Sequence, residues 1–375
     1  MNSFISNKKN RKNQIKIQEN LRKIKSNFFL RILFNHLEKK KVLEIVKYNK
    51  QIQKILNINL NDYKEIHAQI EIEVIPAKNN YGKFINVPKE DELFYHIYFN
   101  NHTQEVKRNY LNKDDEVKKI KVILDYRIKS LYGIFLTCRY VKKIKFIKFN
   151  RSDIKMFGYM FYECNSLEEL DLSNFNTNNA NNMRFMFYGC CKLKELNLSN
   201  FNTNKVIYMN NMFNGCSSLK ELNLLNFNTN NVKDMSNMFY GCSSLKELNL
   251  SNFNTNNVEN MESMFYYCLA LKILNVSNFN TSNVIKMRSM FCFCSSLEEL
   301  DLSNFNTKNV FDVSYMFFRC LSLKKLNILN FSFNMNDFQR MFDECNSLKN
   351  LICSNSAIEK LFINTFNGSN NNFSN

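Results

Sequence analysis

The sequence is poor in several residue types. It has no tryptophan, two prolines and seven glycines among 375 residues, so long flexible linkers are not expected. No stretch reaches 18 consecutive apolar residues, and the N-terminus MNSFISNKKNRKNQ has no apolar run of seven before its charges. Neither a membrane span nor a secretion signal is therefore indicated, and we expect a cytoplasmic protein, with the cell surface or the nucleus as alternatives.

Histidine is also scarce, and its placement argues against catalysis. Only four are present, and none lies in the repeats described below: His36, His67, His96 and His102. The most closely spaced cysteines, Cys190-Cys191 and Cys292-x-Cys294, have no second pair at zinc spacing. Glycine-rich phosphate loops and Gly-x-Ser-x-Gly motifs are absent. We therefore predict no enzymatic activity, no catalytic residue, no metal and no cofactor.

The net charge of +17 belongs to one part of the chain. Residues 1–150 contain 32 Lys and Arg against 15 Asp and Glu, whereas residues 151–375 contain 19 of each kind. A basic segment can bind nucleic acid or an acidic membrane surface. Lys, Asn and Ile are abundant together, however, as an AT-rich genome would produce. We therefore favour codon bias over nucleic-acid binding as the explanation of the basic charge.

What the sequence has in plenty is a repeat of 26 residues. Cysteine marks it at a constant interval, followed by Cys345 after 25 residues: Cys138, Cys164, Cys190, Cys216, Cys242, Cys268, Cys294 and Cys320. A period of this length indicates a solenoid, in which each unit buries its apolar side against its neighbours. The first coil begins near Ile128, and residues 128–366 should form one solenoid without an internal boundary.

Each repeat has two halves with different apolar spacing. Val206 to Cys216 places apolar residues at offsets 0, 3, 6, 7 and 10, which predicts a short helix, with Thr203 as its N-terminal cap. Leu219 to Phe227 reads Leu-x-x-Leu-x-Leu, which predicts a strand with one buried face. Strands of successive coils should then lie side by side in one long parallel sheet.

The pattern Met-Phe-x-x-Cys-x-x-Leu-x-x-Leu-x-Leu-Ser-x-Phe-x-Thr-x-x-Val-x-x-Met resembles the bacterial surface-protein repeat of the BspA-like or DUF285 branch of leucine-rich repeats. The resemblance implies an α/β solenoid, a right-handed leucine-rich-repeat-like coil with one parallel strand and one short helix per repeat. A small N-terminal α+β module should precede it. The family usually has Asp before Thr, where this chain has Asn residues such as Asn202 and Asn228.

The rest of the chain divides by composition. Phe28, Ile32 and Leu37 recur at helical spacing, and this segment resembles an F-box, the helical module that docks on the adaptor of cullin ubiquitin ligases, although the Leu-Pro opening and the Trp are missing. We predict five segments: a disordered basic stretch, 1–25; a helical, F-box-like segment, 26–67; a β-rich segment, 68–127; the solenoid, 128–366; and a disordered tail, 367–375.

The proposed function rests on the outward residues of the strands. Residues at equivalent positions of successive repeats stack into columns; most columns are apolar and should form the core, and the Asn-Thr columns are better explained by a structural role in the turns than by ligand binding. We predict a monomeric, non-enzymatic scaffold that binds a protein partner through this face and could be the recognition subunit of a ubiquitin ligase; a surface or secreted adhesin is the alternative. The candidate partner-binding residues are Glu168, Glu169, Asp171, Glu195, Lys220, Glu221, Lys246, Glu247, Glu298, Glu299, Asp301, Lys324 and Lys325.

The cysteines that recur once per repeat should be buried in the core of the solenoid. Each occupies a position that needs a small apolar side chain, and a cytosolic chain keeps its thiols reduced. We therefore predict that Cys216, Cys242 and Cys268 are buried free thiols.

Overall fold

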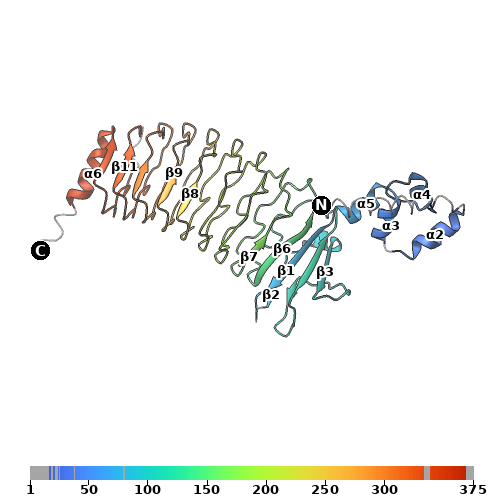
Figure 1. Ribbon diagram of the computed structural model, residues 1–375. Coiled ribbons are helices and arrows are strands. Elements are labelled where there is room, and N and C mark those ends of the chain that lie inside the picture. Colours follow the sequence, from blue (N-terminus) through green and yellow to red (C-terminus); the bar gives the residue numbers. More distant parts are fainter. Residues whose placement is uncertain are drawn as a thin grey trace, which may run out of the picture. The chain divides into compact units, whose positions relative to one another are not determined.

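The computed structural model describes residues 17, 20, 21, 24, 26–37, 39–78, 81–332 and 338–368 (Figure 1). The chain divides into two compact units, residues 1–69 and 70–375, with the division between Gln69 and Ile70. The predicted disorder of residues 1–25 and 367–375 falls mostly outside the described residues. The repeat between Cys320 and Cys345 is one residue shorter than the others, and the position near 333 where we expect this deletion also lies outside the described residues.

The first unit is a group of short helices: α2 (Asn27–Asn35), α3 (Lys39–Val46), α4 (Lys50–Ile55) and α5 (Leu60–His67). Polar side chains begin three of them, since Ser26, Asn49 and Asn59 each accept a backbone N–H of the first turn. The helices α2, α3 and α4 share one small apolar core that also includes Leu21, a residue of the segment predicted to be disordered.

The second unit begins with a sheet that joins the first coil of the solenoid. Its strands are β1 (Ile70–Pro76), β3 (Tyr95–Phe99), β5 (Ile120–Leu124), β6 (Val141–Phe149) and β7 (Glu169–Asp171), in the order β3-β5-β1-β6-β7. A 3-10 helix, η1 (Lys89–Phe94), precedes β3, and β2 (Gly82–Lys83) pairs with β4 (Tyr110–Leu111). Because β1 runs antiparallel to β6, it covers the edge of the first coil.

From β6 onwards the chain winds into stacked coils, seen as one row in Figure 1. The apolar columns predicted from the repeat are buried: Val206, Met209, Met212, Phe213 and Cys216 are each 0% exposed. Phenylalanine rings stack along the whole solenoid, with Phe239 lying 5.7 Å from both Phe213 and Phe265 between ring centroids. The solenoid of repeats near 26 residues is thus confirmed.

The predicted helix of each repeat is wrong. Between residues 150 and 332 the structure has no helical segment; this half of the coil is a series of tight turns. Two backbone positions per coil explain why, since Asn211 has φ +58° and Gly215 has φ +74°, which a right-handed helix does not allow. Their N–H groups point to the next coil, where Asn211 donates to the Ser236 carbonyl at 2.9 Å and Gly215 to the Tyr240 carbonyl at 2.7 Å. The wall that these turns form is called the turn wall below.

Thr203 does not cap a helix either. The residue is 1% exposed, and its hydroxyl donates to the carbonyl of Asn228 at 2.9 Å and accepts the N–H of Asn228 at 2.7 Å. The same exchange recurs at Thr177, Thr229, Thr255 and Thr281. The threonine column therefore joins consecutive coils, as a structural role for the Asn-Thr turns requires.

The single long sheet is also not what forms. Strands pair as β6 with β7, as β8 (Glu247–Asn249) with β9 (Ile273–Asn275), and as β10 (Glu299–Asp301) with β11 (Lys325–Ile328) and β12 (Asn350–Cys353). Residues 194–198 and 220–224 occupy strand positions without ladder hydrogen bonds. After β12 the helix α6 (Ser356–Gly368) covers the last coil and includes the first two residues of the predicted tail.

Candidate interaction face

The strand half of each coil presents short polar stretches between buried leucines. In the coil around Leu222, Lys220, Glu221 and Asn223 are exposed, whereas Leu222 is 7% and Leu224 is 0% exposed. The same positions of neighbouring coils lie beside one another, so each position becomes a row along the solenoid. We call the surface formed by these rows the sheet face.

Near the first coils the rows are neutralised by contacts between coils. Lys142 pairs with Glu168 at 3.3 Å, Lys143 with Glu169 at 2.6 Å, and Lys145 with Asp171 at 2.9 Å. Hydrogen bonds from Ser173, and then from Lys145, lower the pKa of Asp171 to about 2.

The far end has the same kind of pairing. Lys324 contacts Glu298 at 2.6 Å, and this lysine lowers the pKa of the glutamate. The acidic patch of Glu298, Glu299 and Asp301 and the basic patch of Lys324 and Lys325 therefore lie on adjacent coils, β10 beside β11.

The central coils differ, because like charges follow one another along each row. One row is Lys194, Lys220, Lys246 and Lys272, and the adjacent row is Glu195, Glu221 and Glu247. Within the described part of the chain, none of these seven side chains has an ion pair. Lys272 is nevertheless close enough to Glu298 of the next coil to help lower the pKa of that glutamate. The charges of the three coils that contain Lys194, Lys220 and Lys246 are therefore the ones without an ion pair to a neighbouring coil.

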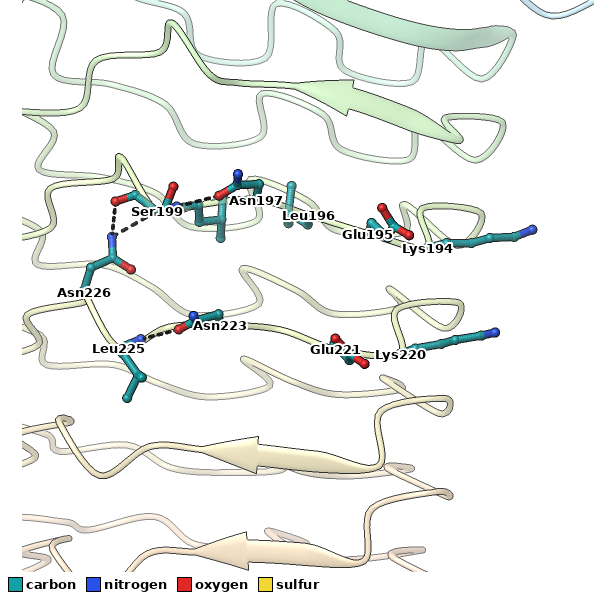
Figure 2. A pocket seen from close by; sticks show the side chains of 11 residues that line it. Lys194, Glu195, Leu196, Asn197, Ser199, Lys220, Glu221, Asn223, Leu225 and Asn226 are labelled. Atoms are coloured by element: carbon teal, nitrogen blue, oxygen red, sulfur yellow. Dashed lines mark hydrogen bonds between the residues drawn. The ribbon is translucent and has the colours of Figure 1, made fainter.

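A shallow groove of about 590 Å³ runs between two of these coils, where the ladder hydrogen bonds are missing. Figure 2 shows Lys194 and Lys220 extending side by side from its edge, with Glu195 and Glu221 next to them. Leu225, which is 54% exposed, lines the opposite end. Similar grooves of about 500 and 520 Å³ lie over the coils on either side.

Asparagine side chains hold these coils together where the backbone does not. The Asn226 amide donates to the carbonyl of Leu198 at 2.9 Å (Figure 2) and to that of Phe201 at 2.8 Å, both in the preceding coil. The equivalent amides of Asn200 and Asn252 make the same pair of bonds. This row fixes the separation of the coils and hence the spacing of the charged rows.

All thirteen predicted face residues lie on the sheet face, and twelve of them are exposed; Asp171 is half-buried between Ser173 and Lys145. Lys194 and Lys272 belong to the same surface but were not among the predicted partner-binding residues. Whether these residues bind a partner stays a prediction.

The turn wall carries a second surface that the repeat pattern did not reveal. Tyr240 and Tyr266 stack at 4.6 Å between ring centroids, Tyr267 and Phe293 lie 4.7 Å apart, and the Arg319 guanidinium lies 5.4 Å from the Phe293 ring. These residues occupy positions that vary between repeats, where other coils have Asn or Gly. A comparison restricted to the repeated positions therefore missed them.

The residues present give no sign of a metal centre. Among the described residues, no group of three or more His, Cys, Asp and Glu side chains is arranged to hold a metal ion. The column thiols are buried, and from Cys164 to Cys345 each donates to a phenylalanine carbonyl of the preceding coil, as Cys216 does to Phe187 at 3.1 Å. Burial raises their pKa well above the ordinary value, so they are poor ligands and poor nucleophiles.

A stack of 26-residue coils with apolar columns and polar rows defines a solenoid repeat protein. The chain belongs to the family described as Mycoplasma protein of unknown function, DUF285, whose model matches residues 112–221, 191–274 and 242–357. These matches cover well over half of the chain and leave out the helical unit, so they give the F-box resemblance no support.

Two solved structures are similar to part of the chain. A leucine-rich repeat protein from Bacteroides ovatus is 18% identical, with a TM-score of 0.35; the match covers 64% of this chain and 66% of that one, just under two thirds. A leucine rich cell surface protein from Faecalibacterium prausnitzii is 17% identical, with a TM-score of 0.29, and the match covers 62% and 78%. No curated protein matches the chain. Among the residues that the structure describes, no helix is both long and apolar enough to cross a membrane.

Proposed function

We propose that this protein is a non-enzymatic scaffold that binds a protein partner through the centre of its sheet face. The observation that carries the proposal is a pair of charged rows, Lys194 to Lys246 and Glu195 to Glu247, that form no ion pair with neighbouring coils. The coils beneath hold the two rows at a fixed spacing. A rigid array of both signs can favour one arrangement of charges on a partner and reject others.

Three features support the central coils over the ends. Their charges have no partner in neighbouring coils, whereas Glu168, Glu169 and Glu298 are already paired. The groove of about 590 Å³ gives the surface a depression into which a partner side chain can fit, and the exposed Leu225 adds an apolar contact beside it. Interfaces combine such apolar points with a polar surround.

A second candidate function is adhesion at a cell surface. The repeat resembles that of bacterial surface proteins, and a sheet face that binds a protein would serve an adhesin equally well. Detection of the protein on intact cells with an antibody against the solenoid, compared with lysed cells, distinguishes this role from an intracellular scaffold. The ubiquitin-ligase role that we predicted for the helical unit has no support beyond the F-box-like pattern and is not part of the proposal.

Site-specific photo-crosslinking tests the proposed face. A photoreactive residue replaces Asn223, which lies in the centre of the sheet face, or Lys286, which is also exposed but lies on the turn side of its coil. We expect the Asn223 position to form adducts with a discrete protein partner in cells, because its side chain lies inside the contact area.

The Lys286 position is the matched control, since it samples collisions with the same solenoid away from the sheet face. Equal adducts from both positions, or none from Asn223 and a discrete one from Lys286, would contradict the proposed face.

A further inference from the structure

The unpaired rows restrict what can lie against them, and we propose that the partner is a second copy of this chain, bound sheet face to sheet face with the two solenoid axes parallel. This inference deepens the proposed function and rests on it. It concerns three coils, in which Lys194, Lys220 and Lys246 form one row and Glu195, Glu221 and Glu247 form the other. In each coil the lysine and the glutamate are consecutive and both exposed.

Symmetry leaves two ways to place two such faces against each other. A two-fold axis along the strands reverses one solenoid and puts the lysine row against the lysine row of the second copy. A two-fold axis along the solenoid keeps the coils in step and puts the lysine row of each copy against the glutamate row of the other. Like charges in close contact are unfavourable, so the pattern selects the second arrangement.

The spacing of the rows supports a second copy over other partners. The rise between lysines is one coil, which is ~4.8 Å for paired strands. Alternate residues of an extended peptide are ~6.6 Å apart, so its charges lose register over three coils. A second copy has the same coil spacing, whatever that spacing is, and every charge therefore meets its counterpart.

The flanking coils do not oppose this arrangement. In the parallel dimer each coil faces its own equivalent, so Glu168 and Glu169 would meet the same residues of the other copy. Both are already paired with Lys142 and Lys143, as Glu298 is with Lys324. Only the central coils enter the contact with free charge of both signs.

The size of the contact makes it weak. Three coils at ~4.8 Å and about six strand residues at ~3.3 Å give ~300 Å² for each copy, compared with ~800 Å² in a stable complex. Exposed ion pairs contribute little each and are screened by salt. We therefore expect transient, salt-sensitive self-association. The excess of +17 lies in residues 1–150, and at ~100 mM salt a Debye length of ~10 Å screens most of it from the central coils.

Sedimentation equilibrium of the full chain measures the association directly. At ~100 mM NaCl and high protein concentration we expect a monomer–dimer equilibrium, and at ~500 mM NaCl we expect it to weaken at least tenfold, because the screening length falls from ~10 Å to ~4 Å. A protein that remains monomeric at ~100 mM NaCl, or that dimerises equally at both salt concentrations, overturns the inference.

A row-swapped variant tests the geometry at constant net charge. It carries Lys194→Glu, Lys220→Glu, Lys246→Glu, Glu195→Lys, Glu221→Lys and Glu247→Lys, all at exposed positions. In the parallel arrangement its glutamate row still meets a lysine row, so it should self-associate like the unmodified chain. It should not associate with the unmodified chain, because lysine would then meet lysine.

The opposite result, in which the variant binds the unmodified chain better than it binds itself, would exclude the parallel arrangement. Equal association of all pairs would show that the rows take no part. The Asn223 crosslinking experiment separates this inference from the proposed function: an adduct of twice the chain mass supports both, a different protein supports only the proposed function, and no adduct contradicts both.

Discussion

Truncation of Phe239 to alanine should be among the most damaging single changes in the solenoid. The ring is 0% exposed and stacks on Phe213 and Phe265 with interplanar angles of 8° and 4°. Burial of a phenylalanine in a packed core corresponds to ~3–5 kcal/mol on truncation, and each aromatic pair adds ~0.5–1.5 kcal/mol. The rigid coils on both sides cannot collapse into the cavity, so we expect a loss of at least ~4 kcal/mol.

Urea unfolding followed by far-UV circular dichroism measures this loss, in a reducing buffer that keeps the thiols free. Two controls separate burial from mere removal of atoms. Lys246→Ala, on the sheet face, should change the free energy of unfolding by ~0.5 kcal/mol or less, and Tyr208→Ala removes an aromatic ring that is 45% exposed. If Lys246→Ala cost as much as Phe239→Ala, the inner and outer faces would be assigned the wrong way round, and the proposed binding face would be lost with them.

Three further outcomes are expected. Thr229→Val should lower the free energy of unfolding by ~1–3 kcal/mol, since the Asn254 N–H and carbonyl both lose their partner, whereas Thr229→Ser should retain most of the stability in the same urea titration. The pKa of Asp171 is lowered to about 2 from its ordinary value of 3.8, so the ionised carboxylate stabilises the folded protein at any pH above 3.8. This contribution should disappear as the pH falls towards 2; acid unfolding of Asp171→Asn should therefore show a smaller pH dependence than that of the unmodified chain. Cys216, which is 0% exposed, should react with a thiol reagent only after unfolding, whereas Cys191, which is half-buried, should react in the native protein; mass spectrometry of labelled peptides distinguishes the two, and rapid native labelling of Cys216 would argue against burial.

The repeat determined which residues are buried but not the backbone between them. Val206, Met209, Phe213 and Cys216 recur at intervals that suit one face of a helix, and a series of turns with two left-handed residues places the same side chains inward. Apolar spacing reports the direction of side chains, so it could not separate the two backbones. Glycine at this position in three consecutive coils, Gly189, Gly215 and Gly241, was the available signal. Other coils place Tyr267 or Arg319 there with positive φ, so the glycines mark only part of the solenoid.

The face was predicted more completely than its behaviour. Alternation around Leu222 and Leu224 is a local property of the strand, and it identified Lys220 and Glu221 as outward residues. Which charges are compensated depends on contacts between coils, and these require the register of the stack. The aromatic cluster of the turn wall depends on that register too, because its rings come from different coils.

The missing ladder bonds between residues 194–198 and 220–224 have a mechanical consequence. On the turn wall the same coils are joined by backbone hydrogen bonds, such as Phe187 N–H to the Met212 carbonyl at 2.9 Å. When the two ends of the solenoid are pulled apart, the turn wall should therefore resist extension more than the sheet face does. The structure should flex like a strip hinged along its turn wall, opening at the centre of the sheet face before any coil unravels, and the force needed would depend on whether that face is covered.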